Sequence, residues 1–219
     1  MSYPKSSRFH LLEQIIRKVN QWDFVWEIIL VWNGPIDVLP DTIQRFFKES
    51  PRKPVSGDDS TTFAQRHKLR AHHKRPFFTI LPQSLNRVDN RWRIAEHIDT
   101  DAILNMDDDI NLHMSGAQCM LQVWRSSPSA LVAIDVRSHF VHAKEGGGPH
   151  GPFGYVARDR SAGFKQYSIA LPRALLTNRE YYVAYDAAWR HKSDESPTKK
   201  GVKEIVDELL CDDIAFNFV

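Results

Sequence analysis

Three consecutive aspartates, Asp107, Asp108 and Asp109, directly follow the short apolar run from Ala102 to Met106. The run predicts a buried strand, and adjacent carboxylates repel one another and are costly to bury without a partner. Because side chains alternate along a strand, Asp107 and Asp109 are expected to share a face that Asp108 does not. A divalent cation such as Mn²⁺ or Mg²⁺ would bind one or two of these carboxylates, whereas a solvated acidic turn would need no ion. The triplet alone leaves both interpretations open.

Strand-like and helix-like segments alternate along the rest of the chain. Strands are predicted at residues 27–32, 77–81, 102–106, 130–136 and 167–171. Helices are predicted at residues 8–19, 41–47, 86–97 and 174–183, with others ending near residue 124 and starting near residue 212. This alternation predicts an α/β fold with a mainly parallel sheet and helices on both faces. Ligands of such sheets gather beyond the carboxyl ends of the strands, where Asn33 and the three aspartates are expected to lie.

The charge of the chain is nearly balanced. Its 219 residues carry 29 Lys and Arg against 27 Asp and Glu, unlike a dedicated nucleic-acid binder, and this length fits one domain over residues 1–219. A basic insertion at about residues 49–76 is either a solvated segment or a patch for acidic glycans, phospholipid headgroups or nucleic acid. No apolar run is long enough to span a bilayer, so a membrane is expected only through an anchor outside this sequence. Cys119 and Cys211 leave a disulfide and two thiols open as alternatives.

Several segments together resemble one known family, the exostosin-like glycosyltransferases of glycosyltransferase family 64. They are residues 31–33, 84–92, 102–109, 166–171 and 211–218. The resemblance implies a GT-A fold, which is a Rossmann-like sheet carrying a metal-binding acidic motif. It also implies transfer of a sugar, typically an N-acetylhexosamine, from a UDP-sugar to a glycan or glycolipid acceptor with retention of anomeric configuration. The implied cofactor is Mn²⁺ (or Mg²⁺), and the implied location is the lumen of the ER or Golgi.

The resemblance also implies roles for individual residues on the donor side. Asp109 would bind the metal, and Asp107 and Asp108 would contact the ribose or the donor sugar. The residues that would contact the uridine and the diphosphate are Lys5, Asn33, Asn86, Asn90 and Arg91. Simpler roles remain open for two of them, because Asn33 precedes a glycine as turn residues do, and Arg91 fits the exposed face of a helix.

On the reactive side, the resemblance implies that Asp212 and Asp213 face the sugar, with Asp213 nearest the anomeric carbon. A carboxylate there would stabilise positive charge on the sugar, either by a covalent bond or by favouring attack from the same face. The simpler alternative is that either aspartate is an N-cap of the last helix. Arg137 and His139 also resemble family positions near the site.

The sequence departs from the family pattern at its ends. Lys5 stands where an arginine is expected, and a lysine offers a point charge instead of a fork of donors. The first strand of the family and the region after the last helix are absent, so the fold is expected to be truncated at both ends. A catalytically inactive relative that acts as a binding module therefore remains the alternative, followed by a binder of acidic ligands that uses the basic insertion.

Overall fold

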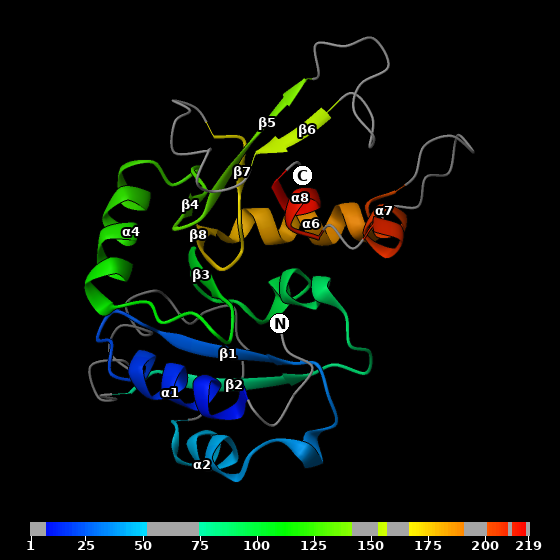
Figure 1. Ribbon diagram of the computed structural model, residues 1–219. Helices are drawn as coiled ribbons and strands as arrows, with labels where there is room; N and C mark the ends of the chain where they lie inside the picture. Colours follow the sequence, from blue (N-terminus) through cyan, green and yellow to red (C-terminus); the bar gives the residue numbers. More distant parts are fainter. Residues whose placement is uncertain are drawn as a thin grey trace, which may run out of the picture. The chain divides into compact units, whose positions relative to one another are not determined.

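The computed structural model describes residues 8–51, 75–141, 153–156, 167–190, 201–209 and 212–217. Lys5, Cys211 and most of the basic insertion lie outside these residues. The chain forms two compact units, Met1–Asn90 and Arg91–Val219, each described here by itself. Figure 1 labels their elements. No helix in the described part of the chain is long and apolar enough to cross a membrane.

The Met1–Asn90 unit is built on two parallel strands. Its elements are α1 (Phe9–Val19), β1 (Glu27–Trp32), the 3-10 turn η2 (Ile36–Val38), α2 (Asp41–Glu49) and β2 (Phe77–Pro82), and the 3-10 helix η3 (Val88–Trp92) spans its end. Strand β1 pairs with β2 in parallel register from Glu27 opposite Phe77 to Trp32 opposite Pro82. The helices predicted at residues 8–19 and 41–47 and the strands predicted at residues 27–32 and 77–81 are thus confirmed, with small differences at their ends.

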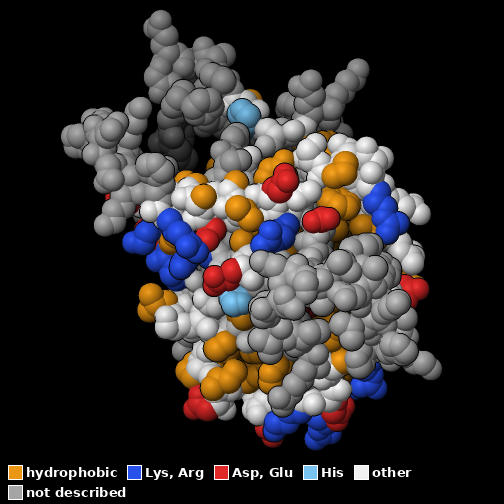
Figure 2. Space-filling view, turned by 180° about the vertical axis from the view of Figure 1, so that it is seen from behind, with side chains coloured by type: hydrophobic (Ala, Val, Ile, Leu, Met, Phe, Trp, Pro, Cys, Tyr) orange, Lys and Arg blue, Asp and Glu red, His pale blue; other side chains and the backbone are white. Residues whose placement is uncertain are grey.

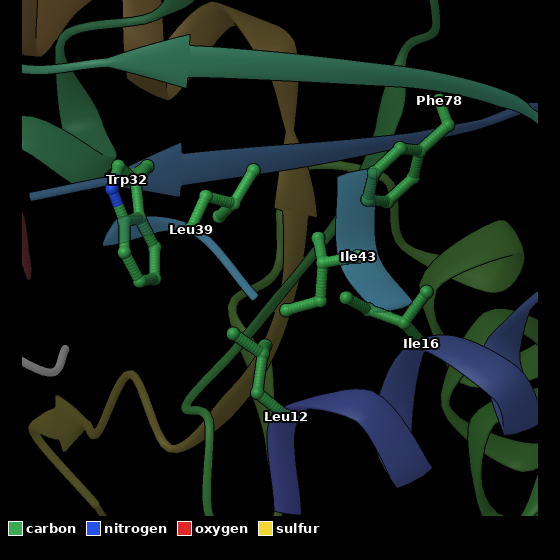
Figure 3. Packing of buried hydrophobic residues seen from close by; sticks show 6 residues of the cluster. All are labelled: Leu12, Ile16, Trp32, Leu39, Ile43 and Phe78. Carbon is green, nitrogen blue, oxygen red and sulfur yellow. The ribbon is translucent and has the colours of Figure 1, made fainter. Parts of the chain in front are cut away.

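One face of the strand pair carries the core of this unit. Side chains alternate along a strand, so Ile28, Leu30 and Trp32 of β1 lie on the same face, which both α1 and α2 cover. The buried cluster consists of Leu12, Ile16, Trp32, Leu39, Ile43 and Phe78. Figure 3 shows these side chains converging between the two helices and the strands. The polar turn after Trp32 is therefore fixed by a packed layer directly beneath it.

The Arg91–Val219 unit contains two small antiparallel sheets. Its strands are β3 (Ala102–Met106), β4 (Val132–Ala133), β5 (Val136–Val141), β6 (Phe153–Val156), β7 (Ile169–Ala170) and β8 (Ala174–Asn178). Its helices are η4 (Ala95–His97), α4 (Met114–Ser126), α6 (Arg179–Arg190), α7 (Val202–Leu209) and α8 (Asp212–Asn217). The strand orders are β3-β8-β4 and β6-β5-β7, and every pairing within them is antiparallel.

The prediction of an α/β fold is confirmed, but the described strands do not form a mainly parallel sheet. Among these residues β1 and β2 are the one parallel pair. The sequence pattern does not distinguish a parallel from an antiparallel pairing of β3 with β8. Helices and other strands lie between them in the chain, and such a long connection is also what a parallel pair requires. Pairing between distant segments, and not local alternation, determines the strand direction.

The helix predicted over residues 174–183 is wrong in its first half. Residues 174–178 form the central strand β8, in which Ala174, Leu175 and Leu176 are buried. A short apolar run buried on both faces has no periodicity that separates it from a helix. The helix α6 begins only after Asn178, whose Oδ1 accepts a hydrogen bond from the Glu180 N–H at 3.0 Å, as a capping residue does.

Two further segments are broken where the sequence predicts continuous elements. The helix expected at 86–97 is instead two 3-10 helices, η3 and η4. The strand expected at 130–136 divides into β4 and β5 at Asp135, which is 2% exposed. The Asp135 carbonyl accepts a hydrogen bond from the Leu171 N–H at 2.9 Å, so the chain leaves one sheet there and enters the other.

Candidate functional site

The acidic triplet begins where β3 ends. The Asp107 N–H donates to the carbonyl oxygen of Arg173 at 3.0 Å, and the Asp107 carbonyl accepts from the Ile110 N–H at 3.4 Å. Asp108 and Asp109 form the turn between these two contacts. Strand alternation therefore does not set the directions of the three side chains. Asp107 and Asp108 are half-buried, whereas Asp109 is exposed.

Arg91 forms an ion pair with the first aspartate of the triplet. Its Nη1 lies 2.6 Å from Asp107 Oδ1, and the two side chains are 12% and 20% exposed. Burial of the Asp107 carboxyl acts to raise its pKa, whereas the Arg91 guanidinium and, to a lesser extent, Arg173 act to lower it, and the pKa lies below its usual value. Asp107 is thus held as a carboxylate, and Arg91 is held at the turn and not on an exposed helix face.

A second ion pair lies beside the turn and was not predicted from the sequence. Arg173 Nη1 donates to Asp135 Oδ2 at 3.0 Å. The same segment is held by Asn105, whose Nδ2 donates to the carbonyl of Pro172 at 2.6 Å. Asp135 is a charged residue inside an apolar run, and a charged group that is buried needs a partner. This is the one signal in the sequence that points to the pair.

The two aspartates of α8 have different surroundings. Asp212 is 8% exposed, and its Oδ2 accepts a hydrogen bond from Trp92 Nε1 at 2.8 Å. Asp213 is half-buried, and its Oδ1 accepts from the Ile214 N–H at 2.8 Å. The indole N–H of Trp92 therefore engages one oxygen of the Asp212 carboxylate. Asp213, which is less buried, is the better placed of the two aspartates to contact a ligand.

An aromatic cluster supports this end of the unit. The Trp92 ring stacks on Phe216 of α8, with centroids 3.9 Å apart and planes 18° apart. Tyr182 and Tyr185 of α6 pack against the same tryptophan. Burial raises the pKa of the Tyr182 phenol far above its usual value, although Arg91 acts to lower it. The contact of Trp92 with Asp212 is not predicted from the sequence, because the two residues lie 120 positions apart.

Asn33 and Asn90 meet within the Met1–Asn90 unit. Asn90 Nδ2 donates to Asn33 Oδ1 at 2.7 Å and to the carbonyl of Leu85 at 2.8 Å, and Asn33 Nδ2 donates to the carbonyl of Arg87 at 3.1 Å. Both asparagines are 4% exposed, whereas Asn86 is exposed. These bonds tie the end of β1 to the segment after β2. The Asn90 amide hydrogens are thereby engaged inside the protein.

Two residues of β5 with weaker family resemblance lie near β7. The backbone N–H of His139 donates to Ser168 Oγ at 3.0 Å, and its Nδ1 lies 2.7 Å from the same oxygen. Arg137 Nη1 donates to the carbonyl of Val136 at 2.8 Å. Ser168 therefore fixes the orientation of the His139 ring.

The donor atoms of the acidic turn suit a hard divalent cation that is partly held by its substrate. No group of three or more His, Cys, Asp or Glu side chains is arranged to hold a metal among the described residues. Mg²⁺ and similar ions at phosphate sites take one or two carboxylates and complete their shell with water and phosphate oxygens. An exposed Asp109 beside two further aspartates fits that arrangement, whereas a cage made of protein ligands alone does not.

A groove of about 380 Å³ lies between α1 and α2, and none of the predicted site residues lines it. Its lining includes Arg17, Arg45, Arg75 and Glu49. Arg17 donates to Glu13 at 2.6 and 2.9 Å and lies in the last turn of α1, where cations stabilise a helix. Figure 2 shows Asp and Glu side chains interspersed with Lys and Arg side chains on the face seen from behind, without identifying the residues of the groove. The charge of Arg17 is thus accounted for by its pairing with Glu13.

Comparison with known proteins identifies the family. The protein-family model described as "Glycosyl transferase family 64 domain" matches residues 1–219 of this chain. Glycosyltransferase family protein 64 C3 of Arabidopsis thaliana is 25% identical over 218 residues, covering 97% of this chain and 54% of that protein. Exostosin-1 of Pongo abelii is 30% identical over 134 residues (60% of this chain, 15% of that protein), and exostosin-like 2 of Homo sapiens is 29% identical over 138 residues (63% and 38%). The chain thus spans about half the length of the first of these relatives and less of the others, and it belongs to glycosyl transferase family 64.

Proposed function

We propose that this chain is a donor-using domain of a retaining glycosyltransferase. It transfers a sugar, an N-acetylhexosamine, from a UDP-sugar to a glycan or glycolipid acceptor with the help of Mn²⁺ or Mg²⁺. The proposal rests on the family membership of the whole chain and on one local arrangement. Consecutive residues Arg91 and Trp92 bind the two acidic motifs, Arg91 at Asp107 and Trp92 at Asp212.

The proposed reaction needs opposite charges at two points, and the presence of Arg91 and Asp213 in this arrangement supports it. Transfer of the sugar leaves additional negative charge on the departing diphosphate and positive charge on the anomeric carbon. A guanidinium presents several N–H donors in a fixed fork and suits phosphate oxygens, so Arg91 binds the diphosphate. Asp213, whose neighbour Asp212 is held by Trp92, stabilises the positive sugar.

Asp109 is the proposed metal-binding residue, and Asp107 and Asp108 orient the ribose or the donor sugar. A bound cation would neutralise charge developing on the diphosphate. The exposure of Asp109 supports this assignment, because a substrate-shared ion must be reached from solvent. Asn33, Asn86 and Asn90 belong to the other unit, and Asn86 is the one whose exposure favours contact with the nucleotide.

The remaining features follow the family. We place both units in a single GT-A domain with a Rossmann-like core, in the lumen of the ER or Golgi, with membrane attachment through an anchor outside the described helices. The parallel pair β1–β2, with Asn33 at its carboxyl end, supports a Rossmann-like core, since ligands of such sheets gather at that edge.

Calorimetric titration with UDP and Mn²⁺, combined with release of UDP from UDP-N-acetylhexosamines, tests the proposal. Metal-dependent UDP binding and turnover are expected for the wild type. Asp109→Ala should reduce both by on the order of a hundredfold, whereas Asp37→Ala, which removes an exposed aspartate of η2, should change neither. UDP binding without turnover for any donor would instead support the inactive binding module, and unchanged binding in Asp109→Ala would refute the metal assignment.

A further inference from the structure

Asn217, at the end of α8, makes two hydrogen bonds to β7 and one to the first turn of its own helix. Its Nδ2 donates to the carbonyl oxygens of Ala170 at 2.9 Å and Asp213 at 2.7 Å, and its Oδ1 accepts from the Ala170 N–H at 2.8 Å. Ala170 belongs to β7, which lies at one edge of the order β6-β5-β7. The amide of Asn217 therefore pairs with this edge as a neighbouring strand would.

Helix α8 depends on such contacts, because a helix of six residues is too short to be stable by itself. Trp92 holds Asp212 at its beginning, and the stack of Trp92 on Phe216 buries its inner face. Asn217 holds its other end. Asp213 lies between these attachments, and its backbone carbonyl is itself bonded to Asn217.

We propose that Asn217 is a positioning residue that fixes Asp213 relative to β7 and thereby directs its carboxylate at the reacting sugar. The inference rests on the proposed role of Asp213. Asn217 acts through the backbone of Asp213, since both of its amide N–H groups are used on protein carbonyls. Its loss should therefore change turnover and leave the donor-binding residues around Arg91 intact.

Two substitutions separate the parts of this contact. Asn217→Ala removes the amide. Asn217→Asp keeps the shape and the acceptor for the Ala170 N–H, but places an oxygen against the carbonyls of Ala170 and Asp213, which repel it. Both variants should lose the fixed position of Asp213, and Asn217→Asp should not restore it.

The first test measures UDP release from UDP-N-acetylglucosamine and UDP-N-acetylgalactosamine with Mn²⁺, together with UDP affinity by calorimetry. Asn217→Ala should lower kcat by on the order of ten- to a hundredfold, as small misplacements do, while the Kd for UDP stays within about twofold. In an Asp213→Asn background the same substitution should cause no further loss. Equal losses in both backgrounds, or a parallel rise in the Kd, would overturn the proposal.

A matched control removes a different helix-end asparagine. Asn178 lies at the end of β8 and caps α6, so Asn178→Ala should lower the melting temperature and leave kcat unchanged. Hydrogen exchange provides a readout that does not depend on activity, because Asn217→Ala should accelerate exchange of the Ala170 amide. Unchanged protection of that amide would refute the attachment of α8 to β7. A wild-type chain that neither binds nor releases UDP would instead refute the proposed function, while the exchange result would still decide the attachment.

Discussion

The guanidinium of Arg91 and the carboxylate of Asp107 approach to 2.6 Å at the end of β3. Both side chains are largely buried there, so the pair is screened less by solvent than a surface pair. The contact places a fork of N–H donors against Asp107, the first aspartate of the acidic turn.

Arg91→Lys should weaken UDP binding by about tenfold, because the charge is kept but the fork of donors is lost. Calorimetry with UDP and Mn²⁺ measures the effect. Arg93→Lys is the control, since Arg93 is exposed and lies 4.9 Å over the Trp189 ring. Equal losses for the two variants would show that general charge, and not the geometry of Arg91, determines binding.

Trp92→Phe should lower the free energy of unfolding by about 2 to 4 kcal/mol, because the Asp212 carboxylate loses its indole donor and a cavity forms beside Phe216. Asp212→Asn keeps an oxygen that can accept the same bond and should cost about 1 kcal/mol or less. Urea denaturation compares the two variants. A cost for Asp212→Asn as large as that of Trp92→Phe would contradict the assigned hydrogen bond.

Asn33→Ala and Asn90→Ala should each cost about 1 to 3 kcal/mol of stability, because each leaves buried partners unsatisfied. The double variant should cost less than the sum, since the Asn33–Asn90 bond is lost once in either case. Asn86→Ala should change stability by less than about 0.5 kcal/mol and should weaken UDP binding. Additive costs for Asn33 and Asn90 would argue against direct coupling.

Alkaline pH should destabilise the protein partly through Tyr182. Burial raises the pKa of its phenol in the folded state above the unfolded value of about 10. The contribution of Tyr182 to the free energy of unfolding is therefore fully present below about pH 10 and is lost as the pH rises toward the pKa in the folded state. Melting temperatures of wild type and Tyr182→Phe between about pH 8 and 12 measure this, and the wild type should lose stability more steeply. Parallel curves would show that Tyr182 does not contribute.

Much of the fold could be predicted because its signals are local. Strands β1 and β3 each form one apolar run, α1 shows helical spacing, and α8 starts at the acidic pair as expected. The strand β8 could not be recognised, because its identity comes from pairing with β3 and β4 on either side. Local propensity carries no information about such partners.

The site was predicted as a set of residues but not as a set of contacts. Arg91, Asp107 and Asp212 were all named from the sequence, yet their partners depend on segments far apart in the chain, such as Trp92 and Asp212, which are 120 residues apart. Two polar residues within apolar runs, Asp135 and Asn217, indicate in the sequence that further buried contacts exist. Each is a polar group that must find a partner when the run is buried.

The strand order β3-β8-β4 also dictates when the acidic turn takes shape during synthesis. The nascent chain makes β3 long before β8, and Asn105 is 67 residues from the Pro172 carbonyl that it binds. Until then the carboxylates of Asp107 to Asp109 follow a strand without its central neighbour, in an intermediate that exposes a pairing edge. The turn therefore acquires its geometry late in translation, and the segment that carries Asp213 joins later still. During that interval the open strand edge is available for pairing with other chains.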